Sequence, residues 1–250
     1  MFELNDRLDV KVVRDVKGRS IVVIDDFYKD PGQVRDLCLS TRSRGNDQLV
    51  NGLPGRRVFV KTNEVRENLQ DIFFKLCGES SIWLSDIHRE QDIPFKHDLF
   101  FHNWKNIGFM CNVINDSTLI QNPVGIIPHQ DRYSDSDVHL YQYGAVVYLN
   151  TPEECAGGTN FYSFKDKISI SSRPPYGEIP VPDNADEMSD EDRFRYVRSN
   201  IDSGGLWKVE CQARMVYNRL VLYEADILHS QNIDLGMFTD YNRINQIFFM

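Results

Sequence analysis

Residues 144–164, GAVVYLNTPEECAGGTNFYSF, hold two runs of apolar residues on either side of a loop that is rich in turn-forming residues. The runs predict two β-strands, Gly144 to Leu149 and Thr159 to Phe164. Similar runs elsewhere, several of which alternate apolar and polar residues, predict further strands over Phe100 to Trp104, Phe109 to Ile114, Lys208 to Val216, Arg219 to Tyr223 and Asn242 to Phe249. Many short strands separated by turn signals are typical of a β-barrel or β-sandwich.

The N-terminal part of the chain combines a hairpin with helices. Two β-rich runs, Val10 to Val16 and Ser20 to Ile24, are separated by Lys17-Gly18, which predicts a hairpin. Asp30 is placed to cap a helix that covers Pro31 to about Ser40. Beyond it we expect a loop at Asn51 to Gly55, a short strand at Arg57 to Lys61 and a second helix at Asn63 to Cys77.

These elements predict one α+β domain that covers residues 1–250. Helical support at about 1–98 precedes a β core at about 99–250, and no strong shift in composition separates two domains. An insertion at 171–205, rich in Pro, Asp and Ser, interrupts the core, and within it Ser189 to Asp192 has the pattern of a capping box for a helix ending at about Ser199. The insertion is either a lid over a binding site or a solvated decoration, and the sequence favours neither.

Charge and cysteine content narrow the class of protein. The chain has 28 Lys and Arg against 37 Asp and Glu, a net charge of −9 that disfavours nucleic acid as a partner. Its five cysteines are scattered and include no CxxC pair, which is typical of reduced thiols in the cytoplasm. Without a signal-peptide pattern or an apolar stretch of membrane-spanning length, we expect a cytoplasmic protein with no membrane partner, either a monomer or a homodimer.

A metal-binding pattern lies at His129-Gln130-Asp131. On an extended segment residues i and i+2 project to the same side, so both side chains can reach one metal ion. A second histidine from a distant strand would complete a set of two histidines and one carboxylate, which favours non-haem Fe(II) because it leaves coordination positions open. The pattern is short enough to arise by chance, and its other interpretation is an ordinary hydrogen-bonded loop pair.

Further motifs surround this pattern in order along the chain. They are Ile127 to Asp131, Val146 to Asn150 followed by Gly157 to Phe161, Leu222 to Ser230, and Tyr241 to Phe249, with Ile21 to Tyr28 nearer the N-terminus. In these blocks the chain resembles the Fe(II)/2-oxoglutarate-dependent oxygenases, in particular a bacterial subgroup of their prolyl-4-hydroxylase-like branch. The resemblance covers most of the chain and is most specific at residues 123–164 and 215–250.

The resemblance implies a double-stranded β-helix core of the jelly-roll or cupin type. It also implies that His129, Asp131 and His229 bind Fe(II), with 2-oxoglutarate and O2 as cosubstrates. Relatives that halogenate have a small residue in place of the carboxylate, so the presence of Asp131 favours hydroxylation. His139 matches no ligand position of the family and is expected to be structural.

Arg243 matches the residue that binds the distal carboxylate of 2-oxoglutarate in the family. Its apolar neighbours indicate a strand in a core, where an arginine needs an anionic partner because burying an unpaired charge is costly. A guanidinium binds a carboxylate through two charge-assisted hydrogen bonds, and the alternative partner is a carboxylate of the protein itself. Tyr148 matches a tyrosine that donates to the same ligand in some relatives, and strand alternation places Asn245 on the face of Arg243.

The sequence therefore predicts a dioxygenase that hydroxylates a C–H bond of a small molecule or amino-acid-like substrate, of the kind met in secondary metabolism. Arg132, Tyr133 and Thr159 are the expected substrate-binding residues. One alternative keeps the same cofactors and acts on a peptidyl side chain of a protein or peptide. Another is a β-barrel module that binds a metal without turnover, and the presence of all three ligands together with Arg243 argues against it.

Overall fold

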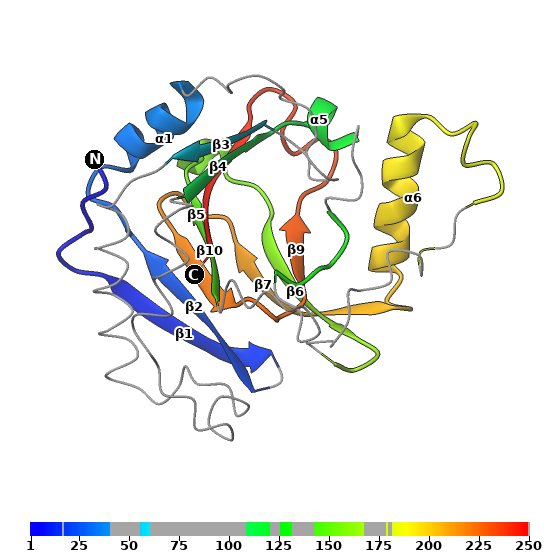
Figure 1. The fold of residues 1–250 in the computed structure, drawn as a ribbon, viewed down its shortest axis with the longest axis horizontal. Helices are drawn as coiled ribbons and strands as arrows, with labels where there is room; N and C mark the ends of the chain where they lie inside the picture. Colours follow the sequence, from blue (N-terminus) through cyan, green and yellow to red (C-terminus); the bar gives the residue numbers. More distant parts are fainter. Residues whose placement is uncertain are drawn as a thin grey trace.

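The computed structural model describes residues 1–16, 18–40, 56–60, 109–120, 126–131, 143–167, 179 and 182–249. In these ranges β-strands predominate over helices, and the paired strands run antiparallel (Figure 1). The strands form a seven-stranded sheet and a three-stranded sheet. This architecture confirms the expectation of a β-rich core.

The larger sheet has the strand order β1-β2-β8-β5-β10-β4-β3. Its strands are β1 (Asp9–Val16), β2 (Arg19–Asp25), β8 (Leu220–Glu224), β5 (Tyr143–Tyr148), β10 (Arg243–Phe249), β4 (Phe109–Ile114) and β3 (Arg56–Val60). The smaller sheet has the order β7-β6-β9, with strands β7 (Trp207–Arg214), β6 (Gly158–Phe164) and β9 (His229–Asn232). The neighbours β8, β5 and β10 come from distant parts of the sequence, so the centre of the larger sheet is built by long-range pairing.

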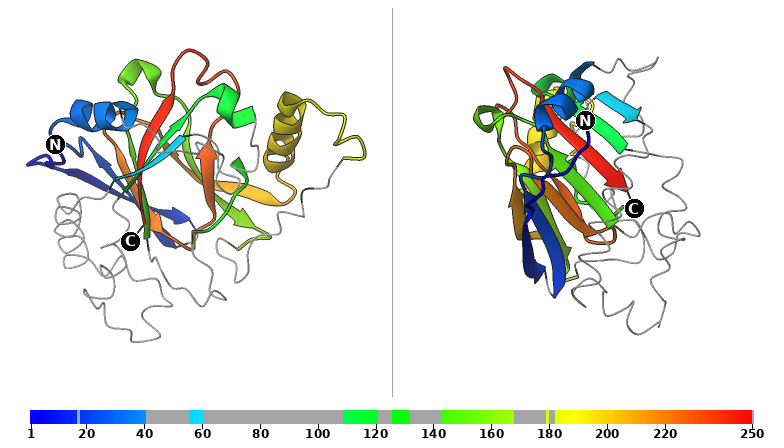
Figure 2. Two further views of the ribbon diagram at one scale, coloured as in Figure 1. Left: turned by 45° about the horizontal axis from the view of Figure 1, so that its top comes forward. Right: turned by 90° about the vertical axis from the view of Figure 1, so that its left-hand side faces the viewer.

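The two sheets face each other and enclose a shared interior (Figure 2). The Phe161 ring of β6 lies 5.2 Å from the Tyr223 ring of β8, measured between centroids. The Tyr148 hydroxyl of β5 lies 2.7 Å from Oγ1 of Thr159 on β6. Because side chains alternate along a strand, every second residue of these strands points into the interior.

Helix α1 (Pro31–Ser40) covers the opposite face of the larger sheet. Asp30 caps the helix as predicted, since its Oδ1 accepts a hydrogen bond from the Gln33 amide at 3.1 Å. Val34 and Cys38 lie one helical turn apart and are both fully buried. The apolar residues of the sheet that share this cluster are Val22, Ile24, Ala145, Val147, Leu220, Leu222, Ile244 and Phe248.

Helix α6 (Asp190–Asp202) lies within the insertion at 171–205. Ser189 is its N-cap and accepts a hydrogen bond from the Asp192 amide at 3.1 Å, as the capping pattern predicts. The helix extends further than predicted because its last turn buries Ile201. Together with Phe194, this residue packs the helix onto the body of the protein, beside β7 and the short helix α5 (Asp116–Ile120) (Figure 1). A lid function of the insertion stays a prediction.

Each strand that was predicted within the described ranges is found, with its ends no more than two residues from the predicted ones. Strand β9 was not predicted because its sequence, His-Ser-Gln-Asn, lacks β-branched and aromatic residues. The predicted loop at 51–55, helix at 63–77 and strand at 100–104 lie outside the described residues.

The region at about 1–98 provides β1, β2 and β3 of the larger sheet as well as helix α1. None of the described helices is long and apolar enough to cross a membrane.

Replacement of Phe194 by Ala should test whether α6 unfolds together with the sheets. Phe194 is fully buried, so we expect the free energy of unfolding to fall by about 3 to 5 kcal/mol in one cooperative transition. Arg195→Ala is the matched control, because the Arg195 side chain is 66% exposed and should change stability little. Thermal unfolding followed by circular dichroism measures both. A separate early transition of the helix, with the main midpoint unchanged, would show that the insertion is an independent unit.

Candidate functional site

Two histidines and one carboxylate from separate segments meet in the interior. The candidate ligand atoms of His129, Asp131 and His229 all lie within 4.8 Å of one another. The His129 amide donates to the His229 carbonyl at 2.9 Å, and the reverse hydrogen bond is 2.8 Å long. The Asp131 amide donates to the Ala225 carbonyl at 2.8 Å. Main-chain hydrogen bonds therefore bring the three predicted ligands together.

The segment before Asp131 is anchored by burial of its apolar residues. Ile126 is fully buried, Ile127 is 4% exposed, and both pack in the interior cluster. Pro128 disfavours helical backbone at the residue before it, which helps to keep the segment extended. On extended backbone His129 and Asp131 project to the same side, as the spacing of the motif requires.

The two histidine rings are oriented by the same kind of hydrogen bond. Nδ1 of His129 lies 3.0 Å from the Ile127 carbonyl oxygen, and Nδ1 of His229 lies 2.9 Å from the Ile227 carbonyl oxygen. A carbonyl oxygen can only accept, so each ring donates from Nδ1, and Nε2 is the nitrogen that faces the cluster as a possible ligand atom. Metal-binding histidines are oriented by such bonds from the other ring nitrogen.

The Asp131 carboxylate completes the cluster. Its Oδ2 is buried, lies 3.5 Å from Nε2 of His229 and has no hydrogen-bond partner in the part of the chain that the structure describes. Burial lowers the pKa of His229 from 6.5 to about 4, against the opposing charge of Asp131, so the imidazole is neutral at pH 7. An unpaired buried carboxylate oxygen beside two imidazole lone pairs is a donor set that fits a divalent transition-metal ion.

Gly144 of β5 leaves room for this carboxylate. A Cβ atom at position 144 would lie 2.9 Å from Oδ2 of Asp131 and also 2.9 Å from Cε2 of Tyr223. Cβ atoms in proteins essentially never approach other atoms that closely, so a larger residue would displace the carboxylate or the tyrosine ring. Gly144 and Tyr223 are register partners in the larger sheet. The glycine is therefore needed for the close approach of these two groups.

Arg243 of β10 lies in the same interior and is only 1% exposed. Its Nη1 donates to Oε1 of Gln231 at 2.7 Å and to Oδ1 of Asn245 at 2.8 Å, and its Nη2 donates to the Gly158 carbonyl at 3.4 Å. The guanidinium Nε has no partner, and no carboxylate in the described ranges pairs with the group. The alternative of an internal salt bridge is therefore not found among these residues. Burial of an unpaired charge is costly, so an anion would be a favourable partner for this guanidinium.

Neutral polar groups surround the guanidinium. The ring centroid of Tyr148 lies 5.7 Å from Cζ of Arg243, and burial raises the pKa of this tyrosine, which keeps its hydroxyl protonated. The same hydroxyl pairs with Thr159, which was predicted to bind substrate and is 4% exposed. The structure thus places Thr159 beside Tyr148, next to Arg243. Asn245 is on the face of Arg243 and accepts its hydrogen bond.

The backbone on both sides of Arg243 is held by the side chain of Asn150. The Ile244 amide donates to Oδ1 of Asn150 at 2.7 Å, and Nδ2 of Asn150 donates to the Asn242 carbonyl at 2.7 Å. Asn150 is fully buried, so both hydrogen bonds are shielded from water. The start of β10, and with it the position of Arg243, therefore depends on this amide.

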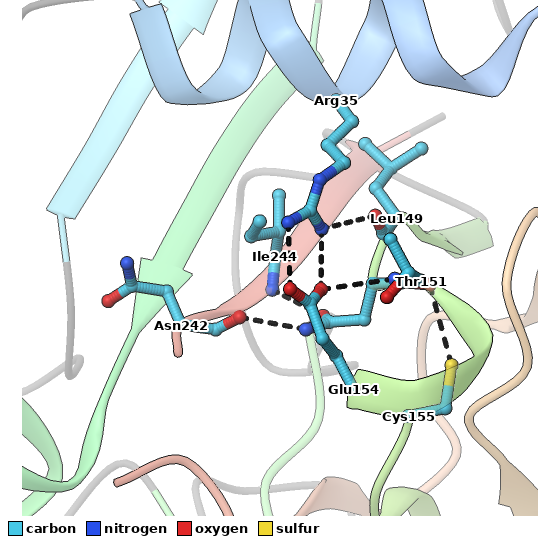
Figure 3. Close-up of polar contacts among 8 residues, drawn as sticks. Arg35, Leu149, Thr151, Glu154, Cys155, Asn242 and Ile244 are labelled. Atoms are coloured by element: carbon cyan, nitrogen blue, oxygen red, sulfur yellow. Dashed lines mark hydrogen bonds and ion pairs between the residues drawn. The ribbon is translucent and has the colours of Figure 1, made fainter. Parts of the chain in front are cut away.

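The loop that carries Asn150 is in turn tied to helix α1 (Figure 3). Arg35 of α1 forms two hydrogen bonds with the Glu154 carboxylate, at 2.8 and 3.0 Å, and a third with the Leu149 carbonyl at 3.0 Å. Glu154 also accepts from the Thr151 amide at 3.1 Å. Burial disfavours the ionised form of Glu154, but its bonds to Arg35 and Thr151 outweigh burial and lower the pKa. The loop is thus fixed on both sides of Asn150.

Tyr223 of β8 is a site residue that the motifs did not indicate. It is 3% exposed, and its ring centroid lies 4.5 Å from that of His229. Burial, and after it the charge of Asp131, raises the pKa of Tyr223 well above its ordinary value, while Arg243 acts in the opposite direction. The hydroxyl therefore stays protonated at neutral pH and is available as a donor.

Some predicted site residues lie outside the described ranges, and some residues of the site were not predicted. Arg132 and Tyr133, the other predicted substrate-binding residues, lie outside the described residues. Gln231 and Tyr223 were missed, because their places in the site depend on strand pairing that the sequence does not display. Gln231 is two residues after His229 and so shares its face of β9, which was itself not predicted as a strand.

A family model described as "Family of unknown function (DUF6445)" matches residues 117–242. This range contains His129, Asp131 and His229 and ends one residue before Arg243. No curated protein matches the sequence.

The solved structures that are similar to the chain include three proteins of 11–13% sequence identity. An N-substituted L-amino acid dioxygenase from Burkholderia ambifaria AMMD is 11% identical, with 91% of this chain and 80% of that chain covered and a TM-score of 0.35. EvdMO1 is 13% identical, with 96% and 54% covered and a TM-score of 0.35. The Fe(II)/(alpha)ketoglutarate-dependent dioxygenase TqaL is 12% identical, with 94% and 62% covered and a TM-score of 0.32. The chain thus spans less than two thirds of EvdMO1 and of TqaL, and TM-scores this low do not establish a shared fold.

Replacement of Gly144 by Ala should weaken metal binding at the cluster. The new methyl group would push against Oδ2 of Asp131, and displacing a ligand in this way should lower the affinity for Mn(II) about tenfold or more. Gly205→Ala is the matched control, because the nearest atom to its added Cβ is 3.6 Å away. Titration with Mn(II), followed by electron paramagnetic resonance, measures the affinity. Equal Mn(II) affinity in the two variants would contradict the assignment of Asp131 as a ligand.

The stability of the metal-free protein should fall in acid because of His229. The folded-state pKa is about 4 and the ordinary value is 6.5, so between these values the unfolded chain binds a proton that the folded chain does not. The free energy of unfolding should therefore decrease as the pH falls from 6.5 towards 4. Urea unfolding at several pH values measures this slope, with His229→Gln as the reference. The same slope in both proteins would show that His229 is not held neutral.

Proposed function

This chain belongs to DUF6445, a family of unknown function. For this chain we propose the function of an Fe(II)- and 2-oxoglutarate-dependent dioxygenase. The proposed reaction hydroxylates a C–H bond of a small molecule or amino-acid-like substrate. One observation carries the proposal: the buried charge of Arg243 has no carboxylate partner among the described residues, and it shares the interior with a cluster suited to a metal ion.

A ligand with two different ends fits this arrangement. One end must supply oxygen atoms to a metal ion, and the other must supply a carboxylate to the guanidinium. 2-Oxoglutarate has both, since a 2-oxo acid group and a distal carboxylate lie at its two ends. Strand β9 connects the two places, because Gln231 accepts from Arg243 and lies two residues, about 7 Å, along the strand from His229.

The donor set supports ferrous iron as the metal. Two imidazole nitrogens and one carboxylate oxygen leave coordination positions open, which is typical of non-haem Fe(II) oxygenases. When bound with 2-oxoglutarate and O2, the iron supplies the oxidising chemistry for insertion of oxygen into a C–H bond. His129 and His229 would bind it through Nε2, and Asp131 would offset part of its charge.

The other residues of the interior would orient the ligand and exclude water. Arg243 would hold the distal carboxylate, with Tyr148 and Asn245 beside the guanidinium. Removal of water strengthens each of these charged contacts, because the effective dielectric constant of the interior is lower than that of water. The apolar residues of the enclosing strands include Val146, Phe161 and Val221.

Several finer features belong to the same proposal. The core would be a double-stranded β-helix of the prolyl-4-hydroxylase-like branch, in a single domain over residues 1–250. Asp131 favours hydroxylation over halogenation. Arg132 and Tyr133 would contact the substrate, and Thr159 would line the cavity beside Tyr148. The alternative substrate is a peptidyl side chain, with the same cofactors and the same site.

Turnover of 2-oxoglutarate in the absence of a substrate tests the activity itself. Protein loaded with Fe(II) without oxygen should convert 2-oxoglutarate to succinate and CO2 slowly after oxygen is admitted, and faster with a substrate. His129→Ala should form no succinate because it lacks a metal ligand. Chromatography of succinate, together with mass spectrometry for the gain of one oxygen atom in candidate substrates, measures both. No succinate above the level of His129→Ala, across a broad substrate panel, would contradict the proposal.

Replacement of Arg243 by Met should separate binding of the cosubstrate from binding of the metal. Methionine fills much of the space without the charge, and loss of a charge-assisted contact should weaken 2-oxoglutarate binding by about tenfold to a hundredfold. The affinity for Mn(II) should stay close to that of the wild-type protein. Arg219→Met is the control, because Arg219 pairs with Asp25 at 2.5 Å outside the interior. Calorimetry with Mn(II)-loaded protein measures the 2-oxoglutarate affinity. An unchanged affinity in Arg243→Met would contradict the proposed role of Arg243.

A further inference from the structure

Tyr223 packs against the candidate metal cluster, in the interior that also holds Arg243. It is on β8 and points into the interior, where its ring centroid is 4.5 Å from that of His229 and 5.2 Å from that of Phe161. The ring therefore packs directly on a proposed metal ligand. A phenylalanine would fill the same space, so packing alone does not account for the hydroxyl group.

No hydrogen bond joins the Tyr223 hydroxyl to a described residue, and its oxygen is not among the fully buried polar atoms that lack a partner. Other buried tyrosines differ in this respect. Tyr148 pairs with a threonine hydroxyl at 2.7 Å, Tyr28 donates to a glutamine oxygen at 2.7 Å, and Tyr162 accepts two hydrogen bonds at 3.2 Å. Buried tyrosine hydroxyls usually have a partner because an unpaired polar group in the interior is costly. The Tyr223 hydroxyl can therefore be reached by a ligand or by water, either of which can be the partner that the described residues do not supply.

The direction of the hydroxyl follows from Gly144. A Cβ atom at that position would lie 3.0 Å from Cζ of Tyr223, the carbon that carries the hydroxyl, and 2.9 Å from Oδ2 of Asp131. The hydroxyl end of the Tyr223 ring and the Asp131 carboxylate thus both lie against Gly144. Asp131 is therefore close to this end of the ring, and Arg243 lies in the same interior.

We propose that the Tyr223 hydroxyl donates a hydrogen bond to a carboxylate oxygen of the 2-oxo acid that spans the metal cluster and Arg243. This inference rests on the proposed function and adds a binding residue to it. A neutral phenol is a suitable group at this place, since it donates to an anion without adding a charge beside Asp131. It also explains why the interior has a tyrosine, and not a phenylalanine, on the ring of His229.

Tyr223→Phe tests the proposal by removal of one oxygen atom. 2-Oxoglutarate should bind about tenfold more weakly to the Mn(II)-loaded variant than to the wild-type protein, because one hydrogen bond to a charged group is lost. The Mn(II) affinity should stay the same, since Tyr223 is not a ligand. The thermal midpoint of the metal-free variant should be equal to or higher than that of the wild type, since the hydroxyl has no protein partner to lose. Calorimetry and thermal unfolding measure these three quantities.

Tyr162→Phe is the matched control on the smaller sheet. Its hydroxyl accepts from Asn160 and Ser230, so the variant should be less stable and yet bind 2-oxoglutarate as the wild type does. Unchanged 2-oxoglutarate affinity in Tyr223→Phe, or a loss of stability like that of Tyr162→Phe, would overturn the inference. If the Mn(II)-loaded wild type binds no 2-oxoglutarate, the proposed function fails first and this inference fails with it.

Discussion

Burial of the Arg243 guanidinium between two sheets is the constraint on which the rest of the interior depends. Arginine is almost never fully buried unless it is paired, and here the described partners are two side-chain amide oxygens and a backbone carbonyl. These groups satisfy donors but bring no opposite charge. The protein nevertheless fixes the residue firmly, because Asn150 binds the backbone on both sides of it and Arg35 holds the Asn150 loop. The interior thus keeps a positive charge in a fixed place, and the proposed function assigns it to a ligand.

The proposed metal site is made by main-chain geometry as much as by the side chains. His129 and His229 are joined by two backbone hydrogen bonds, and each ring is turned by the carbonyl of the residue two positions earlier. The local backbone therefore fixes the direction of Nε2 in both rings, and no other side chain is needed to orient them. The Asp131 carboxylate then lies against Gly144, the position where β5 has no side chain. The proposed cation site and the proposed anion site therefore share the space between the sheets.

The sequence indicated the parts of the site that depend on local spacing. The His129 and Asp131 pair follows from extended backbone, and the apolar neighbours of Arg243 indicated its burial. Strand β9 could not be predicted in the same way, because its four polar residues form a strand only through pairing with β6. Tyr223 was missed for a related reason: its role depends on Gly144, which is far away in sequence and adjacent in the sheet. Long-range pairing, which a single sequence does not display, decides both.

The central claim is that one ligand binds the metal and Arg243 at the same time. Thermodynamic linkage provides the most direct test. A ligand that binds both sites must raise the affinity for the metal by the same factor by which the metal raises the affinity for the ligand. The Mn(II) affinity should therefore rise when 2-oxoglutarate is present and should rise much less with glutarate, which has both carboxylates but no oxo group. The same Mn(II) affinity with 2-oxoglutarate, with glutarate and with neither would contradict the account.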